Sequence, residues 1–69
     1  MEISARNQLR GTVTAVTLGT VMAEVVVDVG GQEIVAAITR SSAQRLGLEE
    51  GSEVAVIVKA TDVMIGAGS

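Results

Sequence analysis

Apolar residues occupy every second position along much of this chain, and this alternation restricts the possible fold more than any other feature. A period of two matches a strand with one buried face, whereas a helix needs a period near 3.6. The alternation is clearest over residues 21–29, where one face carries only Val and Ala. The other face is more polar and carries Met22, Glu24, Val26 and Asp28. The sequence therefore predicts a mostly β fold.

Turn residues divide the chain into four strands and a short fifth one. We predict strands over residues 9–18, 21–29, 32–39, 52–59 and 61–65, followed by a tail over residues 66–69. The predicted turns contain Gly19-Thr20, Gly30-Gly31 and Glu49-Glu50-Gly51. A Gly-Gly pair between two strands is typical of a two-residue hairpin of type I′ or II′.

One helix of one or two turns is predicted between the third and fourth strands, over residues 41–46. Ser41 and Gln44 have the spacing of a capping box, and Gly47 suits the left-handed position that ends a helix. Strands with a single short helix in this place are typical of a small five-stranded OB-like barrel. We assign all of residues 1–69 to one domain.

The side chains available for a core are small, and this points to a core completed by another subunit. Hydrophobic residues make up 48% of the chain, yet none is aromatic. A domain of this length buries only about 60% of the surface that its unfolded chain exposes. The absence of Cys excludes disulfides, and the absence of His and Cys disfavours a zinc or copper site. Residues 34–38 form an apolar run without alternation, which predicts burial on both faces. We therefore expect a homo-oligomer.

Composition also disfavours several classes of function. The net charge is −3, only five residues are basic and no aromatic side chain can stack on a base, so nucleic acid is disfavoured. No apolar run is long enough to cross a membrane, and Met1-Glu2 does not begin a signal peptide. We therefore expect a cytoplasmic protein that is not associated with a membrane. An enzyme is disfavoured because His and Cys are missing and no paired carboxylates lie in an evident pocket. Glu49-Glu50 falls in a turn and is most simply solvated.

Three segments carry groups that bind anions. They are residues 4–7, with Arg6 at their centre, the start of the predicted helix at residues 39–42, and Lys59, the only lysine. Each alone has a simpler explanation: a solvated terminus, N-capping by Thr39 or Ser41, and a strand-end lysine beside Asp62. Together they match a tetrahedral dianion such as molybdate. Two cations balance its charge, while hydroxyls and the unpaired amides of a helix start donate to its oxygens.

At this point the chain resembles a known family, the molbindins, also called the Mop or molybdate-binding TOBE family. The N-terminal signature corresponds to Ser4-Ala5-Arg6-Asn7-Gln8-Leu9, followed by Gly11. The central segment corresponds to Ala37-Ile38-Thr39 with Ser42 and Arg45-Leu46-Gly47-Leu48. The C-terminal signature corresponds to Lys59-Ala60-Thr61-Asp62-Val63-Met64-Ile65. These motifs occur in the same order and cover nearly the whole chain.

The resemblance implies an OB-like barrel completed by strand exchange, in a hexamer built as a trimer of dimers. It implies that molybdate or tungstate binds between subunits. The anion contacts would come from Ser4, Arg6, Thr39, Ser42 and Lys59, with backbone help near Ala5 and Ala60. The family also has a second kind of site near the three-fold axis, whose residues we do not place here. Arg40 matches no fixed family position, and it could add charge to the pocket or point to solvent.

The resulting hypothesis is a binding protein that stores or buffers the oxyanion inside the cell and contributes to its homeostasis. It predicts no cofactor and no metal ligands, because molybdenum is bound only as its oxyanion. The chain carries no DNA-binding or ATPase portion, so we expect a stand-alone family member. Two alternatives stay open: an OB-type nucleic-acid-binding module and a purely structural self-assembling module. Pterin binding is disfavoured because no aromatic side chain can stack on the ring.

Overall fold

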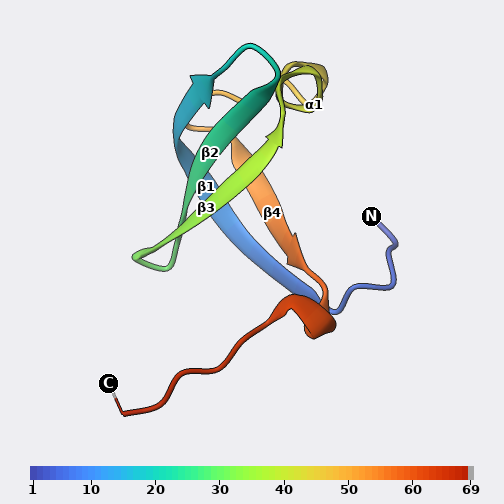
Figure 1. Cartoon of the computed structure of the whole chain (residues 1–69), viewed down its shortest axis with the longest axis vertical. Coiled ribbons are helices and arrows are strands. Elements are labelled where there is room, and N and C mark those ends of the chain that lie inside the picture. Colours follow the sequence, from blue (N-terminus) through green and yellow to red (C-terminus); the bar gives the residue numbers. More distant parts are fainter. Residues whose placement is uncertain (69) are drawn as a thin grey trace.

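The computed structural model describes residues 1–68, which form one antiparallel sheet with a short helix at one end (Figure 1). The four strands lie in the order β3-β2-β1-β4. Along the chain the elements are β1 (Asn7–Leu18), β2 (Met22–Val29), β3 (Gln32–Thr39), α1 (Arg40–Arg45), β4 (Glu53–Val58) and the 3₁₀ turn η1 (Ala60–Asp62). The mostly β fold with one short helix is confirmed, and the first four predicted strands lie within two residues of the observed bounds.

The hairpin between β2 and β3 forms as its Gly-Gly pair predicts. Val29 pairs with Gln32 across the turn, and Gly30 and Gly31 have φ values of +56° and +88°. Positive φ at both central positions defines a type I′ turn, which glycine adopts without steric cost. The register set by this turn places three alternate residues of β2 on the buried face: Ala23, Val25 and Val27.

β1 is the longest strand and changes partner along its length. Its first half pairs with β4, from Asn7 opposite Val58, and its second half pairs with β2, to Leu18 opposite Ala23. The register with β2 shifts between Val13 and Ala15, which marks a bulge that increases the local bend and twist. The sheet is therefore curled and not flat, with β3 and β4 as its two edges.

Helix α1 begins one residue earlier than the sequence predicts, and its N-cap is Thr39. The Thr39 side chain accepts a hydrogen bond from the Ser42 amide at 3.1 Å, so the capping box assigned to Ser41 and Gln44 is wrong. Thr39 can cap because its extended backbone ends β3 as well as preceding the helix. At the other end, Gly47 has φ of +65°, and the Gly47 and Leu48 amides donate to the Gln44 and Ala43 carbonyls. This is a Schellman motif, and it confirms the predicted role of Gly47.

The fifth strand predicted over residues 61–65 is wrong for the single chain. Within the described residues, η1 takes up Ala60–Asp62, and the chain beyond it makes no ladder with the sheet. Met64 and Ile65 are 92% and 88% exposed, and the segment runs away from the sheet (Figure 1). Alternation of apolar and polar residues over five positions does not indicate whether a partner strand is within hydrogen-bonding reach. Of the predicted tail at residues 66–69, Ser69 lies outside the described residues.

The buried core is thin, and one side of it is open. Val13, Val25 and Val27 form its centre, with Ala23 and Ala43 also buried. Beside it lies an apolar groove of about 530 Å³, lined by residues from β2, β3, β4 and the loop after α1, including Val25, Val27, Ala36, Ile38, Leu48, Val54 and Val56. On the outer face of β3, Val35 is 57% exposed. The burial of both faces predicted for residues 34–38 is therefore not reached within one chain.

Candidate functional site

The first group of predicted site residues lies where β1 begins and β4 ends. Asn7 and Val58 form the last pair of the β1–β4 ladder, so Arg6 and Lys59 lie one residue beyond it on neighbouring strands. Both side chains are exposed. The structure therefore brings the two predicted cations to the same end of the sheet, although 52 residues lie between them in the chain.

Short-range hydrogen bonds shape the main chain around these two cations. The Gln8 Nε2 donates to the Ala5 carbonyl at 3.0 Å, which ties the N-terminal segment to the start of β1. After Lys59 the chain turns into η1, where the Asp62 amide donates to the Lys59 carbonyl at 2.9 Å. Ser4 and Ala60 are exposed within the same two segments. We call Ser4, Ala5, Arg6, Lys59 and Ala60 the cationic half-site.

The second group lies at the junction of β3 and α1 and consists of hydroxyls. Thr39 Oγ1 lies 2.7 Å from Ser42 Oγ, to which it donates, and 3.3 Å from Ser41 Oγ. Since the Thr39 proton is directed to Ser42 Oγ, the Ser42 proton is free to point outward to another acceptor. We call Thr39 and Ser42 the hydroxyl half-site.

The backbone amides of α1 contribute less to this half-site than a free helix start would. The Arg40 amide donates to the Val21 carbonyl at 2.8 Å, and the Ser42 amide donates to Thr39 Oγ1. Two of the first three amides of the helix therefore already have acceptors within the chain. The prediction of a helix start with unpaired amides is wrong for these two, because the β1–β2 turn lies against the Arg40 amide and the N-cap Thr39 accepts from the Ser42 amide. The groups that this end offers to an anion are therefore mainly hydroxyls.

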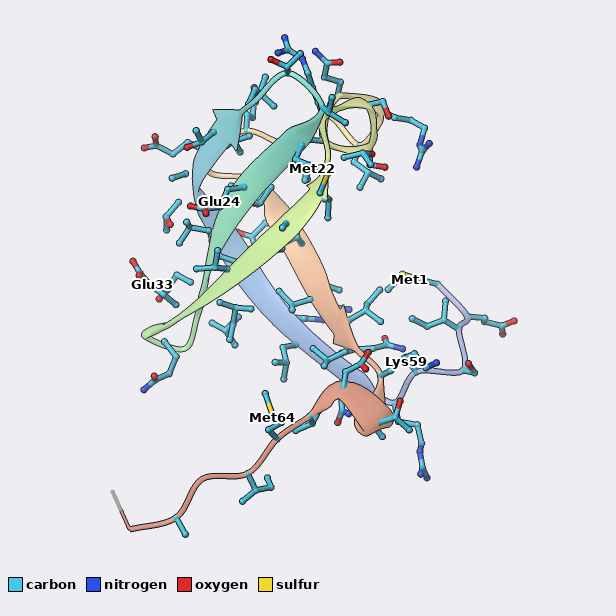
Figure 2. The ribbon with its side chains drawn as sticks, viewed as in Figure 1. Met1, Met22, Glu24, Glu33, Lys59 and Met64 are labelled. Carbon is cyan, nitrogen blue, oxygen red and sulfur yellow. The ribbon has the colours of Figure 1, made fainter. Side chains whose placement is uncertain are left out.

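The two half-sites lie at opposite ends of the sheet. Thr39 pairs with Met22, next to the end of β1 at Leu18, whereas Arg6 precedes the beginning of β1 at Asn7. The 12 residues of β1 therefore separate the two half-sites. A strand rises about 3.3 Å per residue, so this separation is about 30 Å even after some shortening by the bend. Figure 2 shows the same separation, with Met22 near one end of the sheet and Lys59 near the other. No small anion can contact both half-sites of one chain.

Two contacts near the half-sites were not anticipated from the sequence. Arg40, whose position was left open, donates from Nη1 to the Gly19 carbonyl at 3.1 Å and is half-buried. The Gln8 side chain, which was noted only as part of a motif, fixes the Ala5 carbonyl. A local pattern indicates neither contact, because each depends on how the chain turns back on itself.

Other kinds of site are not evident in the part of the chain that the structure describes. Residues 1–68 contain no group of three or more acidic, His or Cys side chains that could hold a metal ion. None of the helices over the same residues has the length and apolar character needed to cross a membrane.

Comparison with known proteins adds independent information. A family model described as the TOBE domain matches residues 3–65. Molybdenum-pterin-binding protein 3 from Clostridium pasteurianum is 50% identical over 66 residues, which cover 94% of this chain and 97% of that protein. The chain belongs to the TOBE domain family, and within it to the molybdenum-pterin-binding (Mop) proteins.

Solved structures agree with this assignment. A molybdate-binding protein from Sporomusa ovata superposes with a TM-score of 0.93 at 46% identity, covering 97% of this chain and all of that one. The cytoplasmic molybdate-binding protein ModG, solved with molybdate bound, superposes with a TM-score of 0.83 at 48% identity. The match covers 87% of this chain but only 43% of the ModG chain. The fold is thus the OB-like fold of Mop proteins.

Proposed function

We propose that this protein binds molybdate or tungstate at interfaces between its subunits. The observation that carries the proposal is the separation of the cationic and hydroxyl half-sites within one chain. Each half-site is exposed and incomplete, and the cationic half-site of one copy can meet the hydroxyl half-site of another. Relatives named for binding molybdate or molybdenum-pterin, together with the family assignment, support this oxyanion as the ligand.

The chemistry of the combined site suits a tetrahedral dianion. Arg6 and Lys59 supply two positive charges, and Ser4 and Ser42 supply hydroxyl donors. Charge-assisted hydrogen bonds contribute about 1.5–3 kcal/mol each. Three or four of them supply about 4.5–12 kcal/mol, a range that includes the roughly 8 kcal/mol of a micromolar dissociation constant. The overall charge of −3 opposes the anion only weakly, since exposed charges beyond about 8–10 Å are screened.

The same proposal includes a homo-oligomer, a hexamer built as a trimer of dimers. Two features of the single chain support association between copies. The apolar groove of about 530 Å³ lies open beside the core, and Met64 and Ile65 project into solvent after η1. An extended apolar segment from a second copy would cover the groove and give the unpaired edges of β3 and β4 hydrogen-bonding partners. Exchange of this segment would also fit the small aromatic-free core, which one chain leaves half open.

In the cell, we propose that the protein stores and buffers the oxyanion in the cytoplasm and does not act as an enzyme. The relatives are named as binding proteins, and ModG is described as cytoplasmic, which supports both points. The two half-sites offer cations and hydroxyls that retain an anion, and no pair of carboxylates or nucleophile with a base stands among them.

Isothermal titration calorimetry with molybdate, tungstate and sulfate tests the proposal. We expect molybdate and tungstate to bind in the micromolar range or tighter, with sites that disappear when the oligomer dissociates. Native mass spectrometry of the same samples gives the number of subunits and of bound anions. Protein concentration must come from amino-acid analysis, because the chain has no Trp, Tyr or Phe. Hexamers whose mass and stability do not change when molybdate is added would instead support a purely structural module.

A further inference from the structure

Arg40 joins α1 to the turn between β1 and β2 through both its main chain and its side chain. The Arg40 amide donates to the Val21 carbonyl at 2.8 Å, and its Nη1 donates to the Gly19 carbonyl at 3.1 Å. The Arg40 side chain is half-buried. Arg40 also directly follows Thr39 and lies two residues before Ser42, so it stands inside the hydroxyl half-site in sequence.

The turn that Arg40 contacts is itself tight and connected to Thr39. The Gly19 amide donates to the Met22 carbonyl at 2.7 Å, and a Cβ added to Gly19 would lie 2.9 Å from that same carbonyl oxygen. Met22 in turn pairs with Thr39 in the β2–β3 ladder. The contacts thus form a closed ring that runs from Gly19 through Met22 and Thr39 to Arg40 and back to Gly19.

We propose that Arg40 is a positioning residue of the anion site, and this rests on the function proposed above. Its guanidinium fixes the first turn of α1 against the β1–β2 turn, and the fixed turn holds Thr39 and Ser42 in place. The Thr39 hydroxyl can direct the Ser42 proton outward only while the 2.7 Å contact between their oxygens is kept. A rotation of α1 about its junction with β3 lengthens that contact, and Arg40 opposes this rotation. Its effect on the anion is exerted through Thr39 and Ser42.

Substitutions at Arg40 separate positioning from simple loss of charge. Arg40→Met keeps the aliphatic stem but removes the donors and the charge, whereas Arg40→Lys keeps the charge and a donor. Arg45→Met is the matched control, because Arg45 is an exposed residue in the last turn of the same helix. In metal sites, removing a group that orients a ligating residue typically lowers affinity about 10–100-fold, and we expect an effect of this order here.

Molybdate titration of the full-length oligomers is the first measurement. We expect Arg40→Met to weaken molybdate binding about tenfold, Arg40→Lys to recover most of that loss, and Arg45→Met to change it less than about twofold. Equal weakening by Arg40→Met and Arg45→Met would overturn the inference, since both remove one positive charge from α1.

Amide hydrogen exchange of Ser42, measured by NMR without any ligand, is the second measurement. If Arg40 holds the half-site, Arg40→Met accelerates exchange of the Ser42 amide, whose proton is bound by Thr39 Oγ1, while Arg45→Met does not. Unchanged Ser42 exchange in Arg40→Met would overturn the inference even if affinity fell. A wild-type protein that gave no heat with molybdate would refute the proposed function, and the exchange data would still decide whether Arg40 holds the half-site.

Discussion

Replacing Gly11 with Ala tests whether β1 lies as close to the end of β2 as it does in the structure. A Cβ at Gly11 would lie 2.6 Å from the Asp28 carbonyl oxygen, 2.6 Å from Val27 Cγ1 and 2.9 Å from Val29 Cγ2. Ordinary contacts of carbon with these atoms are about 3.5–4 Å, so the new methyl overlaps the three atoms by about 0.6–1.4 Å. One of them belongs to the backbone of a strand that also carries the buried Val27.

The expected loss of stability follows from this overlap. Overpacking costs about 1–3 kcal/mol, and relief here requires β1 and β2 to separate, so we expect the upper part of that range. For a domain of this size, 1 kcal/mol corresponds to about 4–8 °C in the unfolding temperature. The Gly11→Ala protein should therefore melt about 10 °C or more below the parent.

Thermal unfolding followed by circular dichroism, without ligand and at one fixed protein concentration, measures this effect. The concentration must be fixed because association contributes to apparent stability. Gly66→Ala is the matched control, since a Cβ there meets no atom within 4 Å and its φ lies outside the positive region. If the two variants melted within about a degree of each other, the close approach of β1 to β2 at Gly11 would be refuted.

Three further predictions concern the anion. Arg6→Ala should weaken molybdate binding by about 2–5 kcal/mol in calorimetry, because the proposed site buries this charge against the ligand. Glu50→Ala, in the loop before β4, should leave binding unchanged, and equal effects of the two variants would contradict the site. Thr39→Val should destabilise the protein by about 1 kcal/mol in chemical unfolding through loss of the N-cap, and should also weaken molybdate binding, while Thr39→Ser keeps both. Phosphate should compete poorly with molybdate in the same titration, because near neutral pH it carries a proton and the half-sites offer no carboxylate to accept it; phosphate affinity equal to that of molybdate would show that an acceptor is present.

Local sequence was sufficient for features whose cause lies within a few residues. The alternation over residues 21–29 correctly indicated the buried face of β2 at Ala23, Val25 and Val27, because side chains point to opposite faces whatever the strand pairs with. Val21 has the same parity but precedes the strand and is exposed. Gly30-Gly31 and Gly47 correctly marked a hairpin turn and a helix end, because both positions need a positive φ that other residues adopt at a cost. The three segments of the candidate site were chosen from their donors and cations, which are properties of the residue types, and their role in anion binding stays a prediction.

Tertiary structure determined the features that depend on contacts between distant segments of the chain. Ser41 and Thr39 are both suitable N-caps, and Thr39 caps α1 because β3 extends to it and delivers the chain in an extended conformation. Residues 61–65 have the composition of a strand but no free edge within reach in their own chain, so no fifth strand forms. Arg40 is directed to Gly19 by the packing of α1 on the β1–β2 turn, across 21 positions of sequence. Above all, the length of β1 places the cationic and hydroxyl half-sites at opposite ends of the sheet. The distance between the two half-sites cannot be inferred from the separate motifs, because it depends on how the strands pair.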